Sequence, residues 1–310
     1  TALLFFEKKA IDEGNYVAAI YSRIDDLKSF PKNFTKNDLA ISDLKSLKWI
    51  PQDPIVGRLI SANTNLDHVA WVKDVGLNYW TKGRGKTRGG SIADRVLYEG
   101  EQQNPADKPY IKGRDIDRFS ISKSNHWLRH NYEKKLDPKI DTLRFSPEFL
   151  FREKLVYRQT SDHIVASLDL TNSLTDKTVH VIVLREDFYS KPKLAYLLGL
   201  LNSKLLTYVY KKISQEENRT FAQVKTFRMK ELPIRTIDFN DPADVQRHDR
   251  MVALVESMLA LHRQLAAARS PQEKELLQRQ IAFTDREIDA LVYELYGLTE
   301  EEIKIVEGGE

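Results

Sequence analysis

The chain has 310 residues, of which 41% are hydrophobic and 30% are charged, and its net charge is +3. This composition is typical of a folded globular protein, and no apolar run approaches the roughly 20 residues needed to span a bilayer. Cysteine is absent, which excludes disulfides, thiolate zinc sites and a cysteine nucleophile. The N-terminus shows no charged and then apolar leader, so we expect a cytoplasmic location and no membrane partner.

The length predicts two or three structural units. The first residue is Thr1, inside what reads as a helix, so we expect the chain to be a piece of a longer protein. A weak apolar face predicts that helix, and its members are Ala18, Ala19, Ile20 and Ile24. We therefore expect a helical or linker segment over residues 1–48.

From Ile55 onward, short apolar runs alternate with Gly, Asn and Asp, which predicts strands in a mostly β domain over residues 49–236. The strand candidates are "HVAWVKDVGLNYW", "KPYIKGRDIDRFSI", "FLFREKLVYR", "DHIVASLDL" and "TVHVIVL". Leucines at helical spacing after Pro192 predict one helix that packs on this β body. A strand-like run, "TFAQVKTFRMKELPI", then closes the domain.

Residues 237–310 predict an antiparallel helical hairpin. Asp241 and Pro242 form an N-cap and first-turn pair, and Ser270 with Glu273 has the spacing of a capping box. Apolar residues recur every three or four positions after both signals, and a short further helix follows. The predicted fold class is α+β: a short helical N-terminal tail, a β-rich domain and a C-terminal hairpin.

Charge is unevenly distributed along the chain. The balance is +2 over residues 1–109, +9 over 110–235 and −8 over 236–310. A basic middle suggests contact with a polyanion, whereas the acidic end suggests another role. The candidate cations are Lys82, Arg84, Lys86 and Arg88 in a Gly-rich loop, then Lys112, Arg114, Arg118 and Lys123, then Arg152, Lys154 and Arg158, and finally Arg219.

The pattern of these cations fits double-stranded DNA. Glycines let a backbone approach phosphates, basic side chains replace condensed counterions, and Arg is suited to guanine in the major groove. No methyl-transfer loop or Gly-rich cofactor turn is present, so we expect no catalytic residue, no metal and no cofactor in this chain. His126 and His130 stand four apart, but no third metal ligand accompanies them.

The ordered motifs resemble the target-recognition domains of TaqI-like and type IIG restriction–modification methyltransferases. "YIKGRDIDRF" (110–119) is similar to their Lys-Gly-x-Asp-Ile-x-Arg-aromatic signature, and "LLGLLNSKLLTYVYK" (197–211) to their Leu-Asn-Ser helix. "FAQVKTFRMKELPI" (221–234) resembles their closing strand, and "DALVYELYGLTEEEI" (289–303) their C-terminal helix.

The resemblance implies that residues 49–236 recognise a specific DNA sequence for an adenine-N6 DNA methyltransferase. That enzyme would use S-adenosylmethionine, its methyltransferase domain would precede Thr1 in the same chain, and a nuclease could be fused to it. The hairpin would serve as a spacer or docking element. No base-contacting residue of the family can be transferred, because these loops vary with the target sequence.

Three alternatives remain at this point. The chain could be a stand-alone specificity subunit that recruits separate methyltransferase and nuclease subunits, although such subunits usually carry two recognition domains. It could be a metal-dependent nuclease that uses Asp117 or Asp115 with Glu133 and Lys135. A coiled-coil scaffold is disfavoured, because the helical repeat covers only the last quarter.

Overall fold

The computed structural model describes residues 3–7, 15–21, 35–40, 53–82, 91–123, 125–188, 191–214 and 222–308. Its contacts divide the chain into two units, residues 1–57 and 58–310, which are described separately. The fold class α+β with a C-terminal helical pair is confirmed.

The first unit contains strands where we predicted a helix. Its antiparallel sheet has the order β1-β2-β3, with bounds Leu3–Glu7, Asn15–Tyr21 and Thr35–Ala40. The prediction of an N-terminal helix was therefore wrong. Ala18, Ala19 and Ile20 lie in β2, whose aromatic and β-branched residues favour a strand once a neighbouring strand is there to pair with it.

Two antiparallel layers form the β body of the second unit. The central sheet has the order β14-β13-β16-β5, with bounds Ala166–Asp169, Lys154–Arg158, Val179–Leu184 and Ala70–Lys73. The second sheet has the order β15-β8-β11-β7, with bounds Leu174–Thr175, Lys108–Ile111, His126–Leu128 and Leu97–Glu99. Only the short β15–β8 pair within these two sheets is parallel.

Three two-stranded ribbons complete the β structure that the coordinates describe in this unit. They are β6–β12 (Asn78–Thr81 and Asp141–Arg144), β9–β10 (Ile116–Asp117 and Ser120–Ile121) and β4–β17 (Thr64–Asn65 and Pro233–Ile234). Short helices connect the strands: α2 (Pro54–Ala62), α3 (Leu66–Val69), α4 (Ile92–Val96), α5 (Pro147–Leu150), α8 (Thr226–Met229), and the 3-10 turns η2 (Gly113–Asp115), η3 (Tyr132–Lys135) and η4 (Glu186–Phe188).

The core of the β body lies between the two sheets. Val156 and Val181 of the central sheet pack there with Ile111 and Leu128 of the second sheet, and all four are buried. Because side chains alternate along a strand, Leu155 and its neighbours two residues away turn to the other face, which α6 covers. All six residues of β16 are consequently buried.

Two helices occupy the segment after Pro192 in place of the single predicted helix. They are α6 (Lys191–Asn202) and α7 (Lys204–Ser214). The chain breaks at Ser203, whose Oγ donates to the Leu200 carbonyl and accepts the Leu206 N–H. This side chain replaces bonds of a continuous helix and caps α7. The closing segment also differs, because α8 occupies most of it and only the two residues of β17 are strand.

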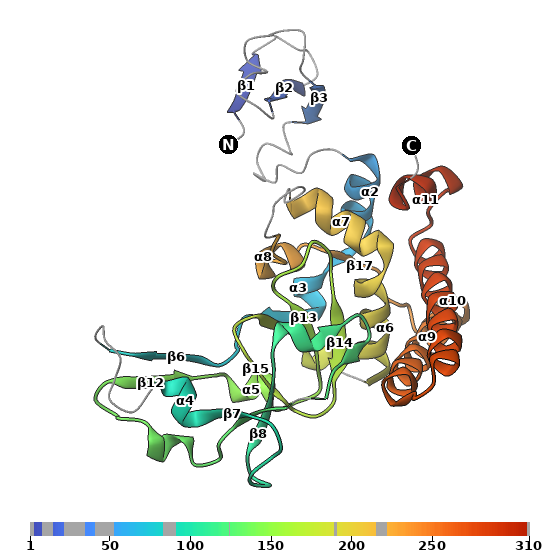
Figure 1. Ribbon diagram of the computed structural model, residues 1–310. Helices are drawn as coiled ribbons and strands as arrows, with labels where there is room; N and C mark the ends of the chain where they lie inside the picture. Colours follow the sequence, from blue (N-terminus) through green and yellow to red (C-terminus); the bar gives the residue numbers. More distant parts are fainter. Residues whose placement is uncertain are drawn as a thin grey trace. The chain divides into compact units, whose positions relative to one another are not determined.

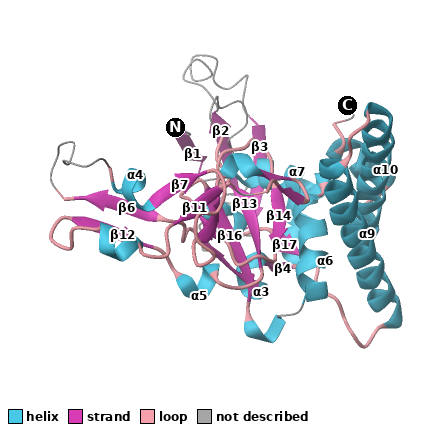
Figure 2. Ribbon diagram, turned by 60° about the horizontal axis from the view of Figure 1, so that its bottom comes forward, coloured by secondary structure: helices cyan, strands magenta, loops and turns pink. Residues whose placement is uncertain are grey.

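The C-terminal hairpin forms where the caps predicted it. Its helices are α9 (Pro242–Ala267) and α10 (Pro271–Leu295), with α11 (Glu300–Val306) after them. Asp241 accepts the Ala243 N–H, and Ser270 accepts the Glu273 N–H. α9 packs on α6, so the order through the unit is second sheet, central sheet, α6 and hairpin (Figure 1; Figure 2). None of the described helices combines the length and apolarity that crossing a bilayer requires.

Candidate nucleic-acid interface

The β6–β12 ribbon extends away from the two sheets (Figure 1), and it carries exposed aromatic side chains. Tyr79 is 39% exposed and Trp80 is 42% exposed, which is unusual for side chains of this size. The guanidinium of Arg144 lies over the Trp80 ring, 5.3 Å from its centroid. Exposed aromatic rings beside cations are the chemistry with which proteins contact nucleic-acid bases.

A buried carboxylate fixes the end of this ribbon that leads into the Gly-rich loop. Asp141 receives hydrogen bonds from the Thr81 hydroxyl (2.8 Å) and the Asp137 N–H (2.8 Å), and Arg95 of α4 forms an ion pair with it (2.7 Å). Burial alone would raise the pKa of Asp141, but these donors lower it below its ordinary value. The carboxylate therefore stays ionised, and the positive charge of Arg95 balances it. This ion pair anchors the ribbon to α4.

A hollow of about 340 Å³ lies between the ribbon and the second sheet. Tyr79, Tyr98 and Tyr110 line it together with Glu99 and Lys112, which form an ion pair at 2.8 Å. Burial alone would lower the pKa of Lys112, but the hydrogen bond to Glu99 raises it above its ordinary value. The hollow therefore offers aromatic walls and a fixed cation.

Four of the sequence-predicted cations lie at or near the surface. The side chain of Arg114 is 67% exposed, and its guanidinium lies 3.5 Å from the Glu99 carboxylate. Lys82 and Lys123 are exposed, whereas Lys112 is mostly covered by its pairing with Glu99. These positions agree with a phosphate-contacting role, which stays a prediction.

Two other predicted cations form internal ion pairs. Arg118 makes a bidentate pair with Asp285 of α10 (2.7 and 3.0 Å) and donates to the Asn202 carbonyl (2.6 Å). Arg158 pairs with Asp117 (2.6 Å) and donates through Nε to the Ile116 carbonyl. Their guanidinium groups are therefore already engaged within the protein.

Lys154 has no exposed surface, which corrects its placement among the DNA-contacting residues. Its ammonium donates to Asp169 (2.6 Å) and to the Leu150 carbonyl (2.7 Å) inside the central sheet. Burial lowers the pKa of Lys154, and Asp169 opposes that shift. Strand alternation places Lys154 on one side of β13 with Arg158, but that side faces inward at Lys154, and Arg152 precedes the strand. Arg152 is half-buried.

Four predicted residues lie outside the described parts of the chain. They are Arg84, Lys86 and Arg88 of the Gly-rich loop, and Arg219 after α7. The loop joins β6 to α4 in the chain, so it continues directly from the exposed ribbon.

The sequence analysis did not single out Asn78, Tyr79, Trp80 or Arg144. A signal for the aromatic pair was present, because two consecutive large aromatics in one strand cannot both face the same core. No local signal marks Arg144, since its position beside Trp80 depends on strand register.

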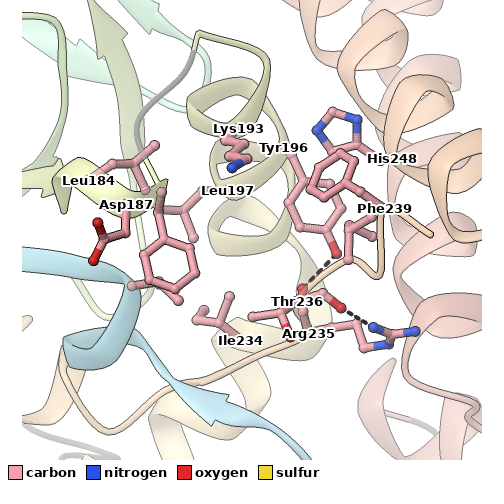
Figure 3. Close-up of a pocket in the computed structure, with 13 residues that line it drawn as sticks. Leu184, Asp187, Lys193, Tyr196, Leu197, Ile234, Arg235, Thr236, Phe239 and His248 are labelled. Carbon is pink, nitrogen blue, oxygen red and sulfur yellow. Dashed lines mark hydrogen bonds between the residues drawn. The ribbon is translucent and has the colours of Figure 1, made fainter. Parts of the chain in front are cut away.

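A separate pocket of about 180 Å³ lies where the β body meets α6 and the hairpin (Figure 3). Its lining is mainly apolar, with Leu184 and Leu197 on one side and Tyr196 near His248 on the other (Figure 3). The Tyr196 hydroxyl donates to the Arg235 carbonyl at 2.8 Å, which holds the segment between β17 and α9 against α6. This lining differs in chemistry from the exposed β6–β12 ribbon, which carries Asn78, Trp80 and Arg144.

A metal-dependent nuclease needs a cluster of metal ligands, and within the described ranges no group of three or more His, Asp or Glu side chains is placed to hold a metal ion. Asp117 is paired with Arg158, and Glu133 lies in η3 beside the Tyr132 hydroxyl.

Comparison with known proteins gives one family match. The model of the TaqI-like C-terminal specificity domain matches residues 108–234. A protein of Methanocaldococcus jannaschii, named for a type II restriction enzyme and methyltransferase, is 26% identical over 208 residues. That alignment covers 67% of this chain but only 16% of the relative, so the chain corresponds to a small part of it.

Among solved structures, one similar chain is the type IIL restriction-modification enzyme MmeI in complex with DNA. The TM-score is 0.44 at 11% sequence identity, and the alignment covers 74% of this chain and 34% of that one. The HsdS subunit from Thermoanaerobacter tengcongensis gives a TM-score of 0.30 at 9% identity, covering 83% and 54% of the two chains. The matched residues 108–234 include the second sheet other than β7, the central sheet other than β5, and the segment from α6 to β17.

Proposed function

We propose that this chain recognises a specific sequence in double-stranded DNA, as the specificity region of a restriction–modification system. The observation that carries the proposal is the specificity-domain match over residues 108–234. The exposed Trp80–Arg144 pair and the surface cations Lys82, Arg114 and Lys123 supply a surface suited to DNA. The net charge of +9 over residues 110–235 favours a polyanion as the ligand.

The proposal extends to the enzyme that this region serves. We propose a cytoplasmic adenine-N6 DNA methyltransferase of the type IIG kind, with the methyltransferase domain in the same chain and S-adenosylmethionine as its cofactor. The name of the Methanocaldococcus jannaschii relative combines restriction and methyltransferase activities, and this chain matches a small part of it. The methyl-transfer chemistry then lies outside residues 1–310, and these residues hold the target DNA in place.

Selection from a randomised duplex pool tests DNA recognition. The purified chain should enrich a short recurring sequence after several rounds, because base contacts discriminate by about 1–3 kcal/mol per base pair. A pool that stays random through selection contradicts sequence recognition.

Mapping the modified base tests the methyltransferase part. The complete protein that contains this chain, incubated with S-adenosylmethionine and the enriched duplex, should place N6-methyladenine within the recurring sequence. Methylated cytosine at that sequence would contradict adenine specificity while leaving DNA recognition intact.

A further inference from the structure

The register of the β6–β12 ribbon places four polar or aromatic side chains on one face. Asn78 lies directly opposite Arg144, and Trp80 lies opposite Thr142. Because side chains alternate along each strand, these four residues share one face, and Tyr79, Thr81, Asp141 and Leu143 share the other.

The second face of the ribbon is already occupied by the protein. Asp141 is buried against Arg95 of α4, and Leu143 packs on the hydrophobic core. Tyr79 lines the hollow beside the second sheet. The ribbon therefore cannot turn this face outward without losing those contacts, which fixes the direction of the first face.

The first face is open to solvent. Asn78 and Arg144 are exposed, and Trp80 is 42% exposed. Within the parts of the chain that the structure describes, neither Asn78 nor Arg144 has a side-chain hydrogen bond or an ion pair. The guanidinium of Arg144 lies over the Trp80 ring in a cation-π contact, which favours this position of the side chain.

The chemistry of this face matches base edges. Arg donates two parallel hydrogen bonds to guanine O6 and N7, and Asn pairs in the same bidentate way with adenine N6 and N7. Facing residues of an antiparallel pair have Cβ atoms about 5 Å apart, so Asn78 and Arg144 can reach neighbouring base pairs. The major groove, about 12 Å wide, admits a two-stranded ribbon.

Charge favours a duplex over a protein partner. The exposed Lys82 follows β6 and the exposed Lys139 precedes β12, so both cations lie at the end of the ribbon where Thr81 pairs with Asp141, and both can contact phosphates. Asp141, within the ribbon, is neutralised by Arg95. An apolar protein partner would need an apolar face, and here Trp80 is the one large apolar side chain among the four.

We propose that Asn78 and Arg144 read bases in the major groove of duplex DNA, with the β6–β12 ribbon as the reading element and Trp80 as the residue that positions Arg144. This inference rests on the proposed function, since it names the residues with which the specificity domain discriminates sequences.

The test uses the full 310-residue chain and the randomised duplex pool. Arg144→Lys keeps the charge but loses the bidentate geometry, so it should relax the preference at one G·C position of the enriched sequence. Asn78→Ala should relax the preference at a neighbouring A·T position. Each change should weaken binding to the enriched duplex by about 5- to 150-fold and leave binding to an unrelated duplex nearly unchanged.

Arg279→Ala provides a matched control, because Arg279 is an exposed arginine of α10 that pairs with Glu275 of the same helix. This control should enrich the wild-type sequence. The inference is overturned if Arg144→Lys and Asn78→Ala also enrich the wild-type sequence, and then the proposed function still stands. It is overturned equally if the variants weaken binding to all duplexes alike, or if the wild-type chain binds single-stranded DNA more tightly than duplex DNA. Failure of the wild-type chain to enrich any sequence would instead reject the proposed function.

Discussion

Arg118 and Asp285 form a bidentate ion pair, at 2.7 and 3.0 Å, across 167 positions of sequence. The same guanidinium donates to the carbonyl of Asn202, whose side-chain amide exchanges two hydrogen bonds, both 3.0 Å, with the backbone of Ala166 in β14. The Arg of the "YIKGRDIDRF" motif and the Asn of the "LLNSK" motif therefore meet. They join the central sheet to the hairpin rather than face a ligand.

We predict that Arg118→Ala destabilises the fold by about 1–3 kcal/mol, because it removes three charge-assisted hydrogen bonds that are only partly exposed. Arg279→Ala removes an exposed pair within α10 and should cost less than about 0.5 kcal/mol. Denaturant unfolding of both variants measures the difference. Equal stability of the two variants would contradict a joining role for Arg118.

The buried Lys154 gives a second prediction. Lys154→Met leaves the Asp169 carboxylate without its ammonium partner, although the Thr171 and Ser173 donors remain, so stability should fall by about 3 kcal/mol. Lys123→Met, at an exposed position, should be nearly neutral. Under conditions where both variants are fully folded, DNA affinity should be unchanged by Lys154→Met. A loss of affinity without a loss of stability would show that Lys154 reaches DNA after all.

Asp289 predicts an unusual dependence of stability on pH. Burial raises the pKa of this α10 carboxyl to about 6, although it accepts the Lys204 N–H at 2.9 Å. Since the unfolded value is about 3.9, the folded state binds more protons between about pH 4 and 6, and stability from this group falls as pH rises through that window.

Asp289→Asn keeps an acceptor for Lys204 and removes the buried charge. We expect the variant to be more stable than the wild type at pH 7 by up to about 3 kcal/mol, with the difference vanishing near pH 4. Unfolding free energies of both proteins across this range measure the effect. A variant that is less stable than wild type by the same amount at every pH would contradict the raised pKa.

The Gly-rich loop gives a prediction from sequence alone. Arg84→Ala together with Arg88→Ala should weaken duplex binding and reduce the slope of log affinity against log salt, by about 0.9 per lost phosphate contact. Arg263→Ala with Arg269→Ala, in the acidic C-terminal segment, controls for the change in net charge. Unchanged affinity and slope in the loop variant would remove this loop from the interface.

Local signals predicted the hairpin best. Asp241 and Ser270 cap α9 and α10, as the sequence indicates, because capping depends on residues within three positions of the helix start. The strands of the central sheet were predicted for the same reason, as their β-branched runs are local. The N-terminal strands were not, because Ala18, Ala19 and Ile20 fit a helix face as well as a strand, and the local pattern does not distinguish the two.

Tertiary contacts explain the errors at the candidate site. The sequence shows where the cations lie along the chain but not which carboxylates they contact in the fold. Arg118, Lys154 and Arg158 therefore looked equivalent to Arg114. Arg118 forms an ion pair with Asp285 and Lys154 forms one with Asp169, whereas the side chain of Arg114 is 67% exposed. Gly113 of the same motif is explained by packing, since a Cβ there would lie 3.0 Å from the Thr178 carbonyl oxygen.

The affinity of the chain for its enriched duplex, relative to a scrambled duplex of the same composition, tests sequence recognition most directly. At physiological salt we predict a ratio of about 10³ or more, as is usual for proteins that read base edges. A ratio close to one would show that the cations hold DNA without reading it, and would contradict a role in specificity.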